Sequence, residues 1–203
     1  MSKIVDKLQS LSKSSVSPIG FHPSAESKIS AMLLIAGLSG AGVKEAGIVA
    51  EVNADAGLVL AQGFSTKTVK QMVEAAGDVP LGVFVKGISE EKLNELLVFG
   101  CDFLVFDIKV PAAVLHEEGI GKFLLIEPSL DWGFVRAINS LDVDGVLIGN
   151  KGEDSFVAVE HLLIYRRFVE LLGKPVMIIL PSLVSGSELG NLWQAGVDGI
   201  VVP

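Results

Sequence analysis

Three charged residues stand directly after apolar runs that must be buried in the fold. Lys86 follows PLGVFV, Asp107 follows FLVF, and Glu127 follows FLLI. A lysine beside carboxylates in a partly dry cleft can act as general acid, general base or Schiff-base nucleophile, because the carboxylates set its protonation state. We therefore predict that Lys86, Asp107 and Glu127 form a catalytic cluster. The alternative is that they form an ion pair that closes the top layer of the fold.

Other polar residues end the remaining apolar runs, and we expect them to bind a substrate: Lys109, Asn150, Gln62, Ser39 and Ser182. The tripeptide PSL ends two of these runs, at 128–130 and at 181–183. Proline stops a strand because it cannot donate to a ladder. The simple interpretation is strand termination, and the more specific one is that Ser129 and Ser182 offer hydroxyls at the mouth of the fold.

Eight apolar runs of strand length are available to position these residues. They carry Val, Ile, Leu and Phe without polar alternation, which is typical of parallel strands covered on both faces. Each is bounded by Gly, Pro, Asp or Ser, and they lie at 31–37, 57–61, 80–86, 102–108, 122–127, 144–149, 175–180 and 198–202.

Segments with helical signals separate the runs. We expect Ser65, Ser89, Asp131 and Ser187 to cap the N-termini of helices, because their short side chains accept hydrogen bonds from the first turn. The longest and most apolar helix is expected at 155–172, with shorter ones at 43–53 and 111–118. Strict alternation of strand and helix predicts a closed (β/α)8 TIM barrel of eight parallel strands or, as the alternative, an open doubly wound sheet.

An internal repeat favours the closed barrel. Asp55, Asp102, Asp144 and Asp198 precede the second, fourth, sixth and eighth runs in the segments NADAGLVL, GCDFLVF, DVDGVLIG and GVDGIVVP. The repeating unit is thus a pair of strand–helix modules, and four pairs close a ring. These aspartates stand at strand entrances, where barrel residues serve stability rather than catalysis, so we exclude them from the site.

The eighth strand has no helix after it in this sequence. We divide the chain into an N-terminal extension, 1–30, and a single barrel domain, 31–203. Residues 2–13 have Ile4, Val5, Leu8 and Leu11 at helical spacing, so we expect a helix that replaces the missing one over the groove between the eighth and first strands. The competing explanation is a sequence that stops short of its last helix.

Composition excludes several classes of function. The formal charge of −8 and the lack of a basic stripe argue against a nucleic-acid partner. No apolar stretch reaches membrane-spanning length and the start is not a secretory signal, so we expect a cytoplasmic protein. Cys101 is expected to be buried and inert. The histidines His22, His116 and His161 lack metal-ligand spacing, so we expect no metal.

Phosphate binding is not expected in the position usual for such barrels. The glycine-rich turns that grip phosphate after the seventh and eighth strands are replaced by ILPSLVSGSE and VVP. GLSGAG at 37–42 is rich in glycine but is a weak cofactor signature. We therefore expect no cofactor.

The segments PLGVFVKG, LLIEPSLDWGFVRAI, VLIGNKGEDSF and PSLVSGSELGNLWQAGVDGIVV resemble the indole-3-glycerol-phosphate synthase barrel. The resemblance implies an aldolase-type barrel in which Lys86 is the general acid, Glu127 its carboxylate partner and Asn150 a substrate ligand. A lysine that this family has near the first strand is absent from AMLLIAGLSG. The stretch AGVKEAGIVAEVNADAGLVLAQG, with PLGVFV, is similar to flavin barrels of the nitronate monooxygenase type.

These observations lead to three hypotheses for the function. The first is a metal-independent lyase, isomerase or aldolase that acts on a small polar metabolite through Lys86, Asp107 and Glu127. The second is a barrel that has lost its chemistry and serves as a binding or assembly module, and the third is a flavin-binding oxidoreductase. The high apolar content and the groove left by the absent eighth helix predict a homodimer. Trp132 and Trp193 either pack in the core or anchor this interface, and we prefer the second interpretation.

Overall fold

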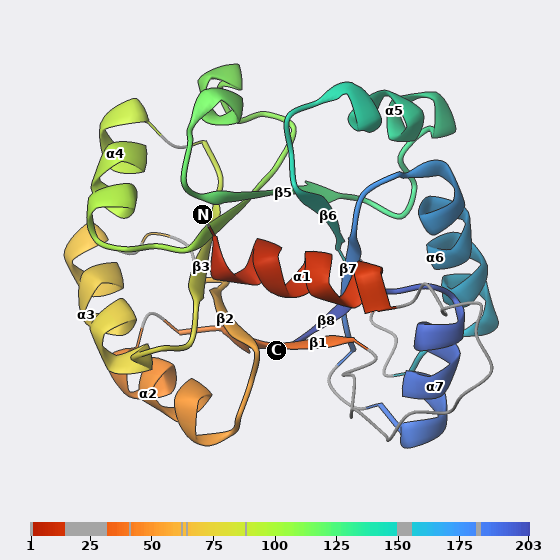
Figure 1. Cartoon of the computed structure of the whole chain (residues 1–203), viewed down its shortest axis with the longest axis horizontal. Coiled ribbons are helices and arrows are strands. Elements are labelled where there is room, and N and C mark those ends of the chain that lie inside the picture. Colours follow the sequence, from red (N-terminus) through yellow and green to blue (C-terminus); the bar gives the residue numbers. More distant parts are fainter. Residues whose placement is uncertain are drawn as a thin grey trace.

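The eight strands form a closed barrel in a computed structural model of the chain (Figure 1). The structure describes residues 2–14, 32–40, 42–61, 63, 65–87, 89–149, 156–181 and 184–203, with backbone only at 12–14. Every pair of neighbouring strands is parallel, and β8 closes the ring by pairing with β1. The prediction of a (β/α)8 barrel is therefore confirmed. The strands are β1 (Leu33–Leu38), β2 (Ala56–Val59), β3 (Leu81–Val85), β4 (Phe103–Phe106), β5 (Gly121–Ile126), β6 (Gly145–Ile148), β7 (Val176–Ile179) and β8 (Gly199–Val202).

Helices connect the strands and surround the barrel (Figure 1). Ser65, Ser89 and Asp131 cap α3, α4 and α5 as predicted, each accepting a hydrogen bond from a backbone N–H of the first turn. The short helix expected at 111–118 is instead a 3-10 helix. The helices are α1 (Lys3–Ser14), α2 (Val43–Glu51), α3 (Thr66–Ala76), α4 (Glu90–Val98), η1 (Ala112–His116), α5 (Trp132–Ala137), η2 (Ile138–Ser140), α6 (Val159–Leu171) and α7 (Gly186–Gln194).

Buried side chains divide into two cores according to strand alternation. Alternate strand residues such as Val83 and Leu104 pack outward against the helices, whereas Phe103, Val105 and Phe123 belong to the second core, inside the barrel. The rings of Phe103 and Phe123 meet edge to face inside the barrel, with centroids 5.7 Å apart.

Glycines on neighbouring strands leave room for these two rings. A Cβ atom at Gly82 of β3 would overlap the Phe103 ring, and one at Gly145 of β6 would lie 3.0 Å from the Phe123 ring. Large residues on β4 and β5 thus interlock with glycines on the adjacent strands, which gives the interior the dense packing of a protein core.

Helix α1 closes the N-terminal end of the barrel (Figure 1). Ile4, Val5 and Leu8 are buried and belong to the same core as the interior strand residues. The predicted helix is therefore present, but its predicted position over the groove between β8 and β1 is wrong. The apolar face of α1 packs into the end of the barrel, against the interior core, rather than against its outer wall.

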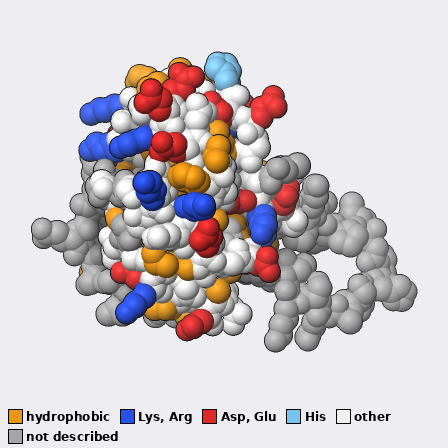
Figure 2. Space-filling model, turned by 90° about the vertical axis from the view of Figure 1, so that its left-hand side faces the viewer, with side chains coloured by type: hydrophobic (Ala, Val, Ile, Leu, Met, Phe, Trp, Pro, Cys, Tyr) orange, Lys and Arg blue, Asp and Glu red, His pale blue; other side chains and the backbone are white. Residues whose placement is uncertain are grey.

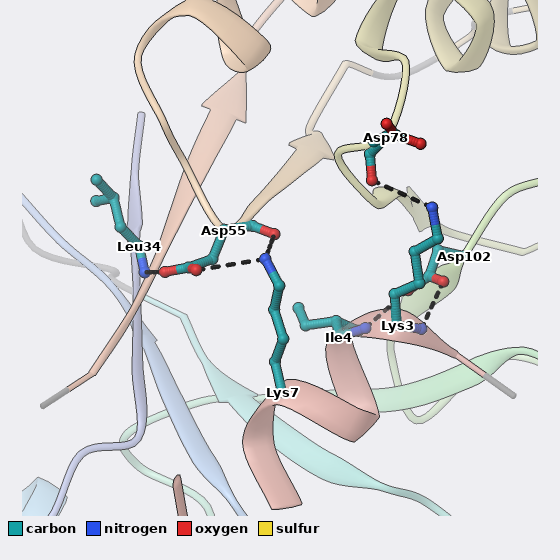
Figure 3. Close-up of polar contacts among 7 residues, drawn as sticks. All are labelled: Lys3, Ile4, Lys7, Leu34, Asp55, Asp78 and Asp102. Atoms are coloured by element: carbon teal, nitrogen blue, oxygen red, sulfur yellow. Dashed lines mark hydrogen bonds and ion pairs between the residues drawn. The ribbon is translucent and has the colours of Figure 1, made fainter. Parts of the chain in front are cut away.

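Polar contacts hold one side of α1 against the strand entrances (Figure 3). The Asp102 carboxylate accepts hydrogen bonds from the Ser2 hydroxyl at 2.8 Å and from the backbone N–H groups of Lys3 and Ile4 at 2.7 and 3.1 Å. The Lys7 amine reaches the carbonyl oxygen and the carboxylate of Asp55, at 2.7 and 3.3 Å. Asp102 thus acts as an N-terminal cap for a helix that is distant in sequence.

The repeated aspartates perform the structural role predicted for them. Asp55, Asp144 and Asp198 each donate their own N–H to a residue of the preceding strand, namely Leu34, Lys122 and Val176. The carboxylate of each aspartate accepts the N–H of that same residue in return, at 2.8 to 3.0 Å. Asp102 likewise donates its N–H to the carbonyl oxygen of Leu81, but its carboxylate accepts N–H groups of α1 instead of the N–H of Leu81.

The outer face over α3 and α4 mixes acidic and basic side chains, with hydrophobic ones between them (Figure 2). An example is the Lys70 amine, which lies 4.0 Å from the carboxylate of Glu74, one turn further along α3.

In the described part of the chain, no helix is long and apolar enough to cross a membrane. Cys101 is buried as predicted, and burial raises the pKa of its thiol to about 12.

Candidate functional site

Strand alternation places the three predicted catalytic residues on the inward faces of adjacent strands. Phe84, Val105 and Leu125 belong to the core inside the barrel, and Lys86, Asp107 and Glu127 each follow one of them by two residues. The last paired residues are Val85 with Phe106, so Lys86 and Asp107 leave the sheet side by side. These side chains therefore meet at the C-terminal end of the barrel, where barrel enzymes build their active sites.

An open cavity of about 740 Å³ lies at this end of the barrel, above β3, β4 and β5. Lys86, Asp107 and Glu127 all line it, as does Lys109 from the predicted substrate-binding set. Its volume is that of a small-molecule site, about 300–1,000 Å³. The three residues therefore line one cavity, and their action as a catalytic cluster stays a prediction.

The carboxylates differ in how they are held. One Asp107 oxygen accepts the backbone N–H of Lys109 at 2.9 Å, which fixes the turn after β4. The carbonyl oxygen of Glu127 accepts the N–H of Leu130, which closes the turn between β5 and α5. Asp131, also on the cavity wall, caps α5 through Gly133 at 2.8 Å. Hydrogen bonds within short turns thus fix the backbone at Asp107, Glu127 and Asp131.

Among the described residues, Lys86 and Lys109 form no ion pair. The alternative, an ion pair of Lys86 with Asp107 or Glu127 that closes the top layer of the barrel, is therefore not seen among the described residues. Both amines belong to exposed residues and face a cavity that also contains carboxylates.

Apolar side chains that the sequence analysis did not select complete the cavity. Phe84 and Leu125, partly buried members of the interior core, line it from inside the barrel. Ile108 and Phe134 line it from the loop after β4 and from α5, and each is 68% exposed. The available signal was their position next to Asp107 and in the helix after Glu127, but sequence spacing alone does not show which way they point.

The other predicted site residues divide into three cases. Ser129 lines the cavity, which agrees with the more specific interpretation of the first PSL motif. Ser39 is exposed and does not line this cavity. Gln62, Asn150 and Ser182 lie outside the described residues.

The N-terminus of α7 differs from the prediction. Ser185 caps this helix rather than Ser187, because Glu188, three residues after Ser185, completes a capping box. The Glu188 carboxylate accepts the N–H and hydroxyl of Ser185 at 2.7 and 2.6 Å and the N–H of Val157 at 3.0 Å. These hydrogen bonds lower the pKa of Glu188 to about 2.

The fold is a (β/α)8 barrel, and comparison with solved structures gives the same fold. Two mutants of the tryptophan synthase alpha-subunit from the hyperthermophile Pyrococcus furiosus superpose with TM-scores of 0.68 and 0.69, at 16% and 15% identity. Another structure of that subunit superposes at 0.66 and 15% identity. Each alignment covers 85% of this chain and 86% of the other.

No protein-family model and no curated protein sequence matches the chain. Identity this low shows the shared barrel alone, and the chemistry must be argued from the site itself.

Proposed function

We propose that this chain is an enzyme of the lyase or isomerase type, which transfers protons or makes and breaks carbon–carbon bonds in a small metabolite. The observation that carries the proposal is the convergence of Lys86, Asp107 and Glu127 on one open cavity at the C-terminal end of the barrel. A lysine and two carboxylates at one mouth supply both an acid and a base.

The residue types suit proton transfer next to a carbonyl group. A carboxylate of Asp107 or Glu127 removes a proton from the carbon beside the carbonyl, and the Lys86 ammonium donates a proton to the carbonyl oxygen as the enol forms. One C–H bond and one N–H bond of the ammonium break, the O–H bonds of the carboxylic acid and of the enol form, and the negative charge that develops on the carbonyl oxygen is stabilised by the Lys86 ammonium. The reverse steps return the proton to the same or to a neighbouring carbon.

Solvent exchange tests this proposal with pools of candidate substrates. The protein is incubated in D₂O with pools of 2-oxo acids, aldehydes and ketoses, and mass spectrometry measures deuterium uptake at carbon. We expect uptake in at least one pool, reduced at least 100-fold in Lys86→Gln, because general acid catalysis contributes about 10²–10⁴-fold. Lys44→Gln is the matched control, since Lys44 is an exposed lysine on α2 that does not line the cavity.

Absence of exchange and turnover in every pool would remove the catalytic proposal. A binding or assembly module would then be the better description of the barrel. Equal exchange by the wild type and Lys86→Gln would show that the activity does not use the proposed acid. A purified protein with a flavin absorption spectrum would favour the oxidoreductase hypothesis instead.

A further inference from the structure

The cavity combines an apolar surface with two cations that have no carboxylate partner among the described residues, and this combination restricts the ligand. Ile108 and Phe134 are both 68% exposed, so each offers a large apolar surface on the cavity wall. Burial of apolar surface contributes about 25 cal/mol per Å², so a ligand that covers these two side chains gains affinity.

Neighbouring side chains do not cover Phe134. Trp132, on the same short helix, packs edge to face on Phe168 of α6, with ring centroids 5.5 Å apart, and carries Arg167 over its ring. Phe134 makes no such ring contact among the described residues and lies on the cavity wall. Of the two aromatic side chains of α5, Trp132 therefore packs the helix against α6, and Phe134 lines the cavity.

The charged groups distinguish an anionic ligand from a cationic one. Asp131 and one oxygen of Asp107 are already engaged as acceptors of backbone N–H groups, and Glu127 has a partner as well. In the described part of the chain, Lys86 and Lys109 have no carboxylate partner. The lining holds three carboxylates and two ammonium groups, and among the described residues the two ammonium groups are the ones that no acceptor engages. A carboxylate is the small group that complements two ammonium groups.

Barrels of this fold often bind phosphate at a helix N-terminus after the seventh strand, and in this chain the Glu188 carboxylate lies at that position, the start of α7. The Glu188 carboxylate accepts hydrogen bonds from the cap of α7 and from Val157. A phosphate at this helix start would have to displace Glu188, and it would meet a negative charge there. This arrangement disfavours phosphorylated ligands.

We propose that the ligand is an unphosphorylated organic acid with an apolar body. Its carboxylate lies between Lys86 and Lys109, and its apolar body rests on Phe84 and Leu125 and is clamped by Ile108 and Phe134. This assignment rests on the proposed function, because it names the substrate class of the same site. Ile108 and Phe134 then determine specificity for the apolar body, and Lys109 positions the anionic group.

Isothermal titration calorimetry with four simple probes tests the assignment on the full chain. Hexanoate carries both features, acetate lacks the apolar body, hexan-1-ol lacks the charge, and hexylammonium reverses it. We expect hexanoate to bind at least tenfold more tightly than each of the other three probes. Equal affinity for hexanoate and acetate would overturn the apolar part, and equal affinity for hexanoate and hexan-1-ol or hexylammonium would overturn the anionic part.

Matched variants locate the binding. Lys109→Gln and the pair Ile108→Ser with Phe134→Ser should each weaken hexanoate binding at least fivefold. Val98→Ser is the apolar control, because Val98 is 81% exposed on the outer helix α4, away from the cavity lining. Lys44→Gln is the charge control. If the controls weaken hexanoate as much as the cavity variants do, the site assignment is wrong.

Failure here is distinguishable from failure of the proposed function. Deuterium exchange that depends on Lys86, without preference for hexanoate, would refute the ligand class and leave the catalytic proposal standing. Hexanoate binding that depends on Lys109, without exchange in any pool, would support the ligand class and refute catalysis.

Discussion

Removal of the Asp102 carboxylate should release α1 from the barrel. This carboxylate accepts three hydrogen bonds from the first residues of the extension, and Figure 3 shows the two that come from backbone N–H groups. Loss of a helix cap costs about 0.5–2 kcal/mol, and a hydrogen bond to a charged group contributes about 1.5–3 kcal/mol. Because the contact is partly exposed to solvent, we expect Asp102→Ala to lower the free energy of unfolding by about 1–3 kcal/mol.

The expected change is measurable by two methods. For a chain of this size, about 1 kcal/mol corresponds to roughly 2–4 °C in melting temperature, so Asp102→Ala should lower it by about 2–12 °C. Hydrogen exchange should also accelerate at the backbone amides of α1 while the barrel strands stay protected. This second measurement separates detachment of α1 from a general loss of stability.

Asp78→Ala is the matched control for Asp102→Ala. Asp78 contacts the same helix, but only its main-chain carbonyl oxygen accepts the Lys3 amine, at 3.2 Å (Figure 3). Removal of its side chain should therefore leave α1 protected. If the two variants show the same melting temperature and the same exchange in α1, the proposed anchoring by Asp102 is refuted.

Three further predictions concern stability and reactivity. Glu188 has a pKa of about 2 in the folded state, below its ordinary value of 4.5, so its contribution to stability is present above pH 4.5 and is lost as the pH falls toward 2. The stability difference between the wild type and Glu188→Gln, measured by urea unfolding, should therefore shrink over this range, and a constant difference would contradict the assigned hydrogen bonds. The pKa of Cys101 is about 12, so its thiol should resist iodoacetamide at pH 8 in the folded protein and react in urea. Mass spectrometry measures the labelling, and rapid labelling of the folded protein would disprove the burial of Cys101. Gly82→Ala should lower the free energy of unfolding by about 1–3 kcal/mol, because its Cβ overlaps the Phe103 ring, whereas Gly190→Ala, where a Cβ meets no neighbour, should not destabilise the protein by such a clash.

The homodimer and the cytoplasmic location stay predictions. Trp132 and Trp193 are 41% and 55% exposed, so both are accessible to a partner subunit. Sedimentation of the purified chain would test the dimer, and monomer at all concentrations would count against it.

The sequence determined the barrel because its signals are local and periodic. All eight strands were predicted within about two residues, since each is a continuous apolar run bounded by residues that end strands. The start of α7 was placed two residues late because SGSE offers two serines, and only the capping box between Ser185 and Glu188 decides between them. The sequence contained that signal.

The sequence also determined where the candidate catalytic residues gather. Alternation along parallel strands fixes which residues face inward, and Lys86, Asp107 and Glu127 continue the inward positions of β3, β4 and β5. Their convergence on one cavity therefore follows from strand parity and from the common direction of the strands.

Only the tertiary structure decided where α1 lies and what surrounds the charged cluster. The spacing of Ile4, Val5 and Leu8 predicts an apolar face, but it does not state which apolar surface that face covers. The exposure of Ile108 and Phe134 likewise depends on how the loop after β4 and helix α5 pack across the barrel mouth. Local patterns fix elements and their faces, whereas the choice among competing surfaces depends on contacts between residues far apart in the sequence.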